Sequence, residues 1–126
     1  MAHAANNSLK DGRQLLTQWQ MQSTTRVPQA GNVLSLRTYK PQRWHNATVP
    51  TSVLGALVKE NVYPDPHFDL NDLRIPDASD DLNRRLGLSK YSHIKGVPNP
   101  FKHPYWFRTQ FSIPASERGR RVWLNF

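Results

Sequence analysis

The amino-acid sequence predicts a mainly β fold with one short helix and long loops. Apolar and polar residues alternate with the period of a strand over residues 15–23 and 105–113, and again over 122–126 after a polar turn. Residues 44–61 contain the best helical pattern in the chain. Ten prolines among 126 residues interrupt much of the remainder, which predicts long irregular connections.

The first strand is expected within residues 15–23. Trp19 and Met21 fall on one side of this segment and three glutamines on the other, as in a strand that is buried on one face. The residues before it are polar and without period, so we interpret 1–14 as a flexible lead-in and 15–126 as the domain.

Residues 27–39 predict a loop followed by a short extended piece. Pro28, Gly31 and Asn32 are turn formers, and the apolar residues Val33, Leu34 and Leu36 come after them.

The helix of the 44–61 region is expected to begin just after Pro50. Thr51 or Ser52 can cap its first turn, and four apolar residues then form a single stripe, namely Val53, Leu54, Leu57 and Val58. Gly55 and Ala56 keep the helix slim, so it can pack closely against one end of a sheet.

Two stretches are predicted to be irregular. Residues 63–73 contain Pro64 and Pro66, which remove two amide donors and disfavour helix in the residues before them. Residues 75–100 are rich in Asp, Asn, Ser and Pro, with one possible helical turn at Leu82, Leu86 and Leu88, and we interpret them as a surface insertion.

The last part of the chain predicts a β-hairpin. Strand 105–113 ends at Pro114, residues 115–120 form a polar turn that contains Gly119, and strand 122–126 follows. A sheet of two or three strands buries too little apolar surface to offset the entropy of ordering it. We therefore expect 15–126 to be the amino-terminal part of a truncated β-sandwich that needs further carboxy-terminal domains of the same polypeptide.

The formal charge of +8 raises the possibility of a nucleic-acid partner, which the distribution of charge argues against. Arginine and lysine are scattered along the chain, and only Arg118, Arg120 and Arg121 form a tight cluster, whereas phosphate tracking needs a continuous basic face. We expect no nucleic-acid partner. No apolar run is long enough to cross a membrane, so none is expected as a partner either.

The absence of cysteine excludes disulfides, thiolate nucleophiles and thiolate metal sites. The five histidines show no metal-ligand spacing, and no cofactor motif is present, so neither a metal nor a cofactor is expected. The absence of cysteine does not assign the protein to a cellular compartment. Ala2, His3 and Ala4 have the A-x-A form of a signal cleavage site, which is compatible with a secreted or periplasmic parent protein.

Four segments resemble one protein family when they are taken together and in order: WQMQSTTRV (19–27), WHNATVPTSVLGALVK (44–59), YPDPHFDLNDL (63–73) and PYWFRTQFSIPASERGRRVWLNF (104–126). They are similar to the amino-terminal sugar-binding-like domain of family 2 glycoside hydrolases, in the branch of β-mannosidases, plant-type endo-β-mannosidases and exo-β-glucosaminidases. Asp69 departs from the glycine usual in the family loop, and His67 from the usual aromatic residue.

The resemblance implies an incomplete galactose-binding-like jelly-roll β-sandwich, packed in the whole enzyme against a catalytic (β/α)8 barrel that this chain lacks. In that family two barrel glutamates act as acid/base and nucleophile in a retaining mechanism, which needs carboxyl groups about 5 Å apart. The chain contains only Glu60, expected at a helix end, and Glu117, expected in a turn. No catalytic residue is therefore predicted here.

Asp65 and Asn71 are candidate substrate-binding residues, because the resemblance implies that the 63–73 loop reaches toward the sugar pocket. A carboxylate and an amide on a proline-stiffened loop can hydrogen-bond sugar hydroxyls with little loss of conformational entropy. The alternative is that both side chains bond their own backbone in turns.

Trp106 and Arg108 are the second pair of candidates. They fall on one face of the predicted strand and could offer an aromatic platform with a guanidinium beside it for an oligosaccharide. The alternative is core or interface packing.

The sequence thus predicts the non-catalytic amino-terminal portion of a glycoside hydrolase that acts on β-mannosides or β-glucosaminides. Its partners would be carbohydrate, through the parent enzyme, and the missing domains. The alternative is a stand-alone carbohydrate-binding module. The two differ in completeness, since an independent module should close its sheet within the chain.

Overall fold

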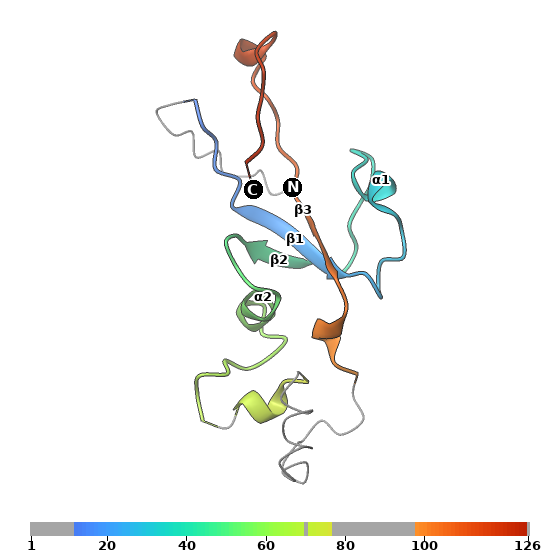
Figure 1. Ribbon diagram of the computed structural model, residues 1–126, viewed down its shortest axis with the longest axis vertical. Coiled ribbons are helices and arrows are strands. Elements are labelled where there is room, and N and C mark those ends of the chain that lie inside the picture. The colour runs from blue at the N-terminus through green and yellow to red at the C-terminus, as the bar shows by residue number, and fades with distance from the viewer. Residues whose placement is uncertain (1–11, 70, 77–97, 126) are drawn as a thin grey trace.

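The structure, a computed structural model, describes residues 12–69, 71–76 and 98–125. Their centre is a three-stranded antiparallel sheet of β1 (Gln18–Ser23), β2 (His45–Thr48) and β3 (Tyr105–Arg108), in the order β2-β1-β3. Two helices, α1 (Gly31–Leu34) and α2 (Val53–Lys59), lie on either side of β1 (Figure 1). The prediction of a mainly β fold is confirmed at this level.

β1 is the middle strand because it pairs along both edges. Met21 lies opposite His45 of β2 and Phe107 of β3, and its side chain is completely buried. Full burial of a side chain of this size contributes about 1.5–3 kcal/mol relative to exposure. The strand begins at Gln18, three residues later than the predicted segment.

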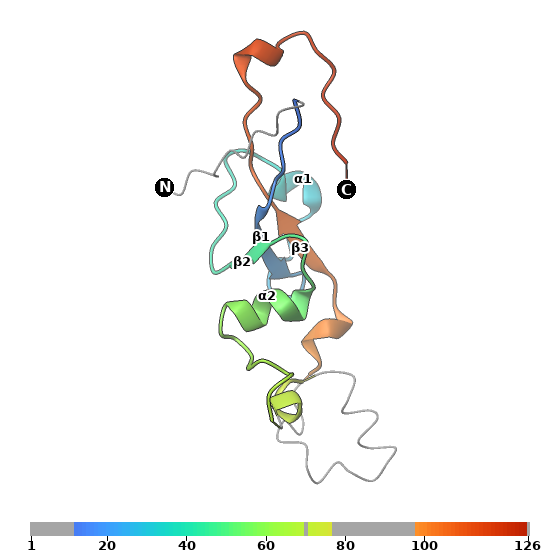
Figure 2. The same ribbon diagram turned by 90° about the vertical axis from the view of Figure 1, so that its left-hand side faces the viewer.

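β2 was not predicted, because its four residues fall within the region that carries the helical pattern. The helix itself is confirmed. α2 begins after Ser52, whose hydroxyl accepts a hydrogen bond from the amide of Gly55 at 2.9 Å. The connection between β2 and α2 is short, so the helix lies directly under the sheet (Figure 2).

The core lies between the sheet and α2. Its buried members are Met21, Ala47, Ala56 and Leu57, one or two from each packed element. A ring of partly buried residues surrounds them, and Trp19, Val53, Tyr63, Phe101, Tyr105 and Phe107 pack against this cluster. The small side chains of Ala47 and Ala56 let the helix approach the sheet closely, as the slim face of α2 predicted.

Residues 24–43 cover the opposite face of the sheet. They contain α1, a single helical turn, where the sequence predicted a short extended piece. The extended piece was wrong because Leu34 is buried while Val33 and Leu36 are exposed, so residues 33–36 bury one apolar side chain and no alternating row. This covering also explains why Gln22, expected on an exposed face, is buried and donates through its side-chain amide to the carbonyl of Arg43.

Residues 61–69 and 71–76 belong to the irregular loop that the two prolines predicted, which contains a 3₁₀ turn, η1 (Asn71–Arg74). A second 3₁₀ turn, η3 (Pro100–Lys102), leads into β3 and is capped by Asn99, whose side chain accepts from the amide of Phe101 at 2.8 Å. The predicted helical turn at Leu82, Leu86 and Leu88 lies outside the described residues, as do residues 1–11 of the lead-in.

Residues 109–125, here called the arm, extend away from the sheet and turn back at η4 (Ala115–Glu117) (Figures 1 and 2). The predicted hairpin is wrong in two respects. The strand expected over 105–113 ends at Arg108, and residues 122–125 form no strand. Both limbs of the arm retain their alternating apolar residues, but within the described residues neither limb forms a backbone ladder with another segment.

Candidate functional site

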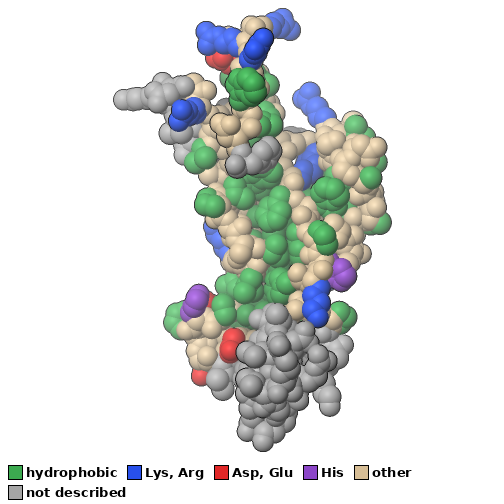
Figure 3. All heavy atoms as spheres, viewed as in Figure 1, with side chains coloured by type: hydrophobic (Ala, Val, Ile, Leu, Met, Phe, Trp, Pro, Cys, Tyr) green, Lys and Arg blue, Asp and Glu red, His purple; other side chains and the backbone are tan. Residues whose placement is uncertain are grey.

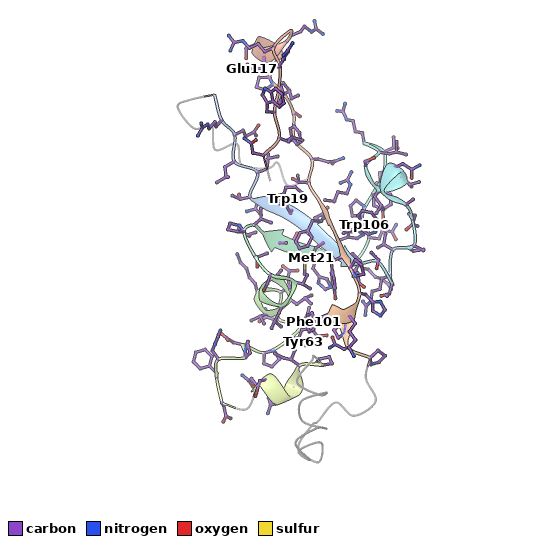
Figure 4. All side chains as sticks on the ribbon, in the orientation of Figure 1. Trp19, Met21, Tyr63, Phe101, Trp106 and Glu117 are labelled. Carbon is purple, nitrogen blue, oxygen red and sulfur yellow. The ribbon has the colours of Figure 1, made fainter. Side chains whose placement is uncertain are left out.

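The loop that carries two of the four candidate residues is anchored to the core by Tyr63. This side chain packs against the core cluster, and its ring meets that of Phe101 at 6.0 Å between centroids and 55° between planes (Figure 4). Tyr63 comes directly before the two prolines, so the first residue of the stiff segment is fixed by packing. Tyr63 thus ties the start of the loop to the core.

Asp65 and Asn71 lie at the two ends of one compact turn. A carboxylate oxygen of Asp65 accepts from the backbone amide of His67 at 3.0 Å, an Asx turn. The side-chain amide of Asn71 donates to the backbone carbonyl of Asp65, also at 3.0 Å. The structure therefore brings these two candidates together, and both side chains bond the backbone of their own loop.

Asp69 has a positive φ of 51°, in the left-handed region that favours glycine. This position is the one at which the resembled family usually has glycine. Aspartate tolerates the left-handed conformation better than most residues, so it can occupy a position that otherwise favours glycine. His67, the other departure, is exposed and contributes its backbone amide to the Asx turn.

Each of the two loop candidates has hydrogen-bonding capacity to spare. The second carboxylate oxygen of Asp65 and the side-chain oxygen of Asn71 make no hydrogen bond within the described part of the chain. Both residues are half-buried. The loop thus presents two acceptors and the second amide hydrogen of Asn71, held in a fixed relation to one another, which is the chemistry that recognises hydroxyl groups.

Trp106 lies on the face of β3 that points away from α2. It pairs with Gln22 of β1 and packs over Gly31, where a Cβ atom would lie 3.3 Å from the indole ring. Gly31 therefore allows the first turn of α1 to approach the indole (Figure 4). The indole is half-buried by this contact.

Arg108, two residues further along β3, binds the last residue of α1 and the segment that follows it. Its Nε donates to the carbonyl of Leu34 at 2.9 Å and its Nη2 to the carbonyl of Leu36 at 3.3 Å. The guanidinium carbon lies 5.7 Å from the ring centroid of Tyr39, and that ring meets Trp44 edge-on at 6.1 Å. Arg108 thereby caps the exposed carbonyls at the end of α1 and fastens the covering segment to the sheet.

The two candidate pairs lie on opposite faces of the sheet. Tyr63, which anchors the Asp65 loop, packs against the core cluster on the α2 side. Trp106 and Arg108 both contact α1 on the other face, because alternate residues of a strand point to the same face. The predicted residues therefore form two separate groups rather than one site.

Two tyrosines and one arginine form a cluster that the sequence analysis did not identify. Burial raises the pKa of the Tyr63 hydroxyl above its ordinary value, and the guanidinium of Arg26 opposes this. Burial likewise raises the pKa of Tyr105, with a further increase from Tyr63 and an opposing effect of Arg26. The three lie together because Thr24 donates to the carbonyl of Pro104 at 3.0 Å, a contact between distant segments that has no signal in the sequence.

The glutamates form no catalytic pair. Glu60 follows α2 and accepts weakly from the side chain of Asn46 at 3.4 Å, whereas Glu117 lies at the tip of the arm and pairs with Arg120 at 3.3 Å (Figure 4). Within residues 12–69, 71–76 and 98–125, no three His, Asp or Glu side chains group in a way that could hold a metal ion. None of the helices in the same ranges is both long and apolar enough to span a membrane.

A curated protein of similar sequence is an exo-beta-D-glucosaminidase of Streptomyces avermitilis. The two are 26% identical over 111 residues, which is 88% of this chain and 10% of the relative. The chain thus spans about a tenth of the length of the curated relative that it matches. No family model and no solved structure matches the chain.

The similarity relates this chain to one part of a glycosidase. The relative is a glycoside hydrolase, and the similarity extends over the sheet, α2 and the Asp65 loop, since it covers 88% of the chain. At 26% identity the relationship is distant.

Proposed function

We propose that this chain is the non-catalytic amino-terminal portion of a family 2 glycoside hydrolase, with a retaining exo-β-glycosidase as the parent protein. The observation that carries the proposal is the similarity of 88% of the chain to a tenth of an exo-beta-D-glucosaminidase. On this view the chain supports a catalytic barrel contributed by the remainder of the parent polypeptide.

The positions of the two glutamates support a non-catalytic role. A retaining mechanism needs two carboxyl groups about 5–5.5 Å apart. Glu60 and Glu117 stand at the end of α2 and at the tip of the arm, each engaged with another side chain. The acid and the nucleophile would therefore come from elsewhere in the parent enzyme.

The arm supports the proposal of an incomplete jelly-roll sandwich. Five large apolar side chains are exposed along it, with exposed fractions from 39% at Phe111 to 77% at Trp123. The backbones of residues 110–113 and 121–125 make no hydrogen bond to another backbone within the described residues. Apolar side chains and unpaired peptide groups in one extended segment are what a strand presents before its neighbours are added.

We place the sugar-binding contribution of the chain in the Asp65–Asn71 turn. Its spare carboxylate and amide atoms are fixed in position by the Asx turn and by the packing of Tyr63. A carboxylate would suit a glucosaminide in particular, because the amino group of that sugar is cationic when protonated. Trp106 and Arg108 are weaker candidates for sugar binding, because both side chains already contact residues within 31–39.

Replacement of Asp65 by asparagine in the whole parent enzyme tests the role of this turn. Asparagine can still accept from the amide of His67, so the loop keeps its shape while the negative charge is lost. We expect KM for an aryl β-glucosaminide to rise about tenfold, equivalent to about 1.4 kcal/mol, with kcat changed less. An unchanged KM would remove Asp65 from the sugar pocket.

A binding measurement on the chain itself distinguishes the proposed function from the alternative of a stand-alone carbohydrate-binding module. Titration calorimetry with chitosan-derived and mannan-derived oligosaccharides should give no saturable heat if the turn only completes a pocket formed with the barrel. Saturable binding that is lost in the Trp106→Ala variant would favour the module instead.

A further inference from the structure

We propose that Asn46 is an acceptor site for N-linked glycosylation when the chain passes through a secretory pathway, and that the folded domain accommodates the glycan. Asn46, Ala47 and Thr48 form the Asn-x-Thr sequence in which x is not proline. The proposed function does not involve this motif, so the assignment of Asn46 does not depend on that function.

The position of the motif in the fold supports the assignment. All three residues belong to β2, an edge strand of the sheet, so their backbone is extended and one side of the strand has no neighbouring strand within the described residues. Asn46 is exposed, whereas Ala47 between the two polar residues is buried in the core. The alternation of the strand thus directs the acceptor amide outward while the strand stays anchored.

The present contacts of the two polar side chains are weak enough to be replaced. The amide of Asn46 is 3.4 Å from a carboxylate oxygen of Glu60, near the limit for a hydrogen bond. The hydroxyl of Thr48 accepts from the ammonium group of Lys59 at 3.2 Å. Both contacts are exposed, so a glycan on Asn46 disturbs no buried interaction.

The chemical step is a transfer from a lipid-linked oligosaccharide. The side-chain nitrogen of Asn46 forms a bond to C1 of the first N-acetylglucosamine, the bond from C1 to the pyrophosphate oxygen breaks, and the lipid pyrophosphate leaves. The amide nitrogen loses one proton, and no oxidant or reductant is required.

A glycan at this position has a structural consequence. An exposed edge strand presents unpaired backbone groups that can pair with another chain. A bulky hydrophilic group on Asn46 would cover the open edge of β2 and hinder such pairing.

The experiment is expression of the full chain behind a cleavable secretion signal in yeast. Asn6, Asn7 and Ser8 form a second Asn-x-Ser sequence outside the described residues, so every variant is made in an Asn6→Gln background. Secreted and cell-retained chains are treated with peptide N-glycosidase, which converts a glycosylated asparagine to aspartate, and are then analysed by peptide mass spectrometry.

We expect Asn46 of the secreted chain to carry the glycan. The modification should disappear in Asn46→Gln and in Thr48→Val, which keeps the shape of threonine without its hydroxyl, and should persist in Thr48→Ser. A chain that is unmodified in both fractions would overturn the proposal. So would a glycan confined to retained, misfolded material, or a glycan that survives Thr48→Val.

Discussion

The Arg108 side chain joins two parts of the chain that lie far apart in sequence. Its guanidinium donates to the carbonyl of Leu34, the last residue of α1, and to that of Leu36 just beyond it. Because Leu34 lies 74 positions away, these contacts fasten the segment that covers the sheet to β3.

Removal of the Arg108 side chain should loosen the segment that covers the sheet. Two hydrogen bonds from a charged donor are lost in Arg108→Ala, and at a half-exposed position their net contribution is about 1 kcal/mol. Hydrogen exchange at the amide of Ser35, which donates to Gly31, should accelerate about fivefold. Arg108→Lys should recover little of this, because lysine lacks the two-pronged geometry.

The matched control for Arg108 is Arg118→Ala. Arg118 is exposed in the arm, and among the described residues its hydrogen bond is that of its backbone amide to the carbonyl of Ala115. Exchange at Ser35 should be unchanged in this variant. Equal acceleration in both variants would mean that loss of positive charge, and not the contact with α1, is responsible.

Tyr63 and Tyr105 should make the stability of the domain fall at alkaline pH. Their pKa values are raised in the folded state, chiefly by burial, so the unfolded chain loses its phenolic protons first. Their contribution is therefore complete below the ordinary value of 10.0 and is lost as pH rises from there through the folded pKa. Phenolate absorbance during a pH titration measures the folded values.

The Tyr63→Phe and Tyr105→Phe variants test the assignment of this pH dependence. Each removes one titrating hydroxyl and keeps the ring that packs against the core. We expect the alkaline loss of stability to become smaller in each variant. A loss as steep in the double variant as in the parent chain would exclude these two hydroxyl groups as its cause.

Asp65 and Asn71 show the limit of residue-level prediction in the site. Their place in one stiff loop could be predicted, because Pro64 and Pro66 exclude regular structure. Each side chain makes one 3.0 Å hydrogen bond to the backbone of the same turn, with a partner six or fewer positions away, and keeps a further acceptor atom. Residue types alone do not distinguish these arrangements.

At the scale of elements, α2 was the best predicted part of the fold because its signals are local. A capping serine, a proline before it and one apolar stripe all act within two turns. β2 was missed because four residues are too few to display a period, and they are followed closely by a helix. The arm shows the reverse case, since its alternating residues predict a strand whose hydrogen-bonding neighbour the described residues do not supply.

Loss of the helix cap should destabilise α2 measurably. Ser52→Ala removes the acceptor for the amide of Gly55, and such a change usually lowers the free energy of unfolding by about 1 kcal/mol. Urea titration followed by helical circular dichroism measures the loss. Ser52→Asp keeps a capping oxygen and should stay close to the parent chain, whereas equal effects of the two variants would exclude the cap as the cause.

At the scale of the whole molecule, the described residues combine a small packed centre with a long open extension. The centre has α2 on one face of the sheet and residues 24–43 on the other, so both faces are covered. The arm is different, with exposed apolar side chains along its limbs and arginines gathered at its tip (Figure 3). We therefore expect the packed centre to be more stable against local unfolding than the arm.

Site-resolved hydrogen exchange of the chain measures this difference in stability. We expect the amides of β1 and β3 to be protected, whereas those of residues 110–113 and 121–125 should exchange at nearly the rate of an unstructured peptide. In the proposed parent enzyme, the same arm amides should become protected. Arm amides that are already as protected as those of β1 in the chain alone would contradict the proposal that the arm awaits further strands.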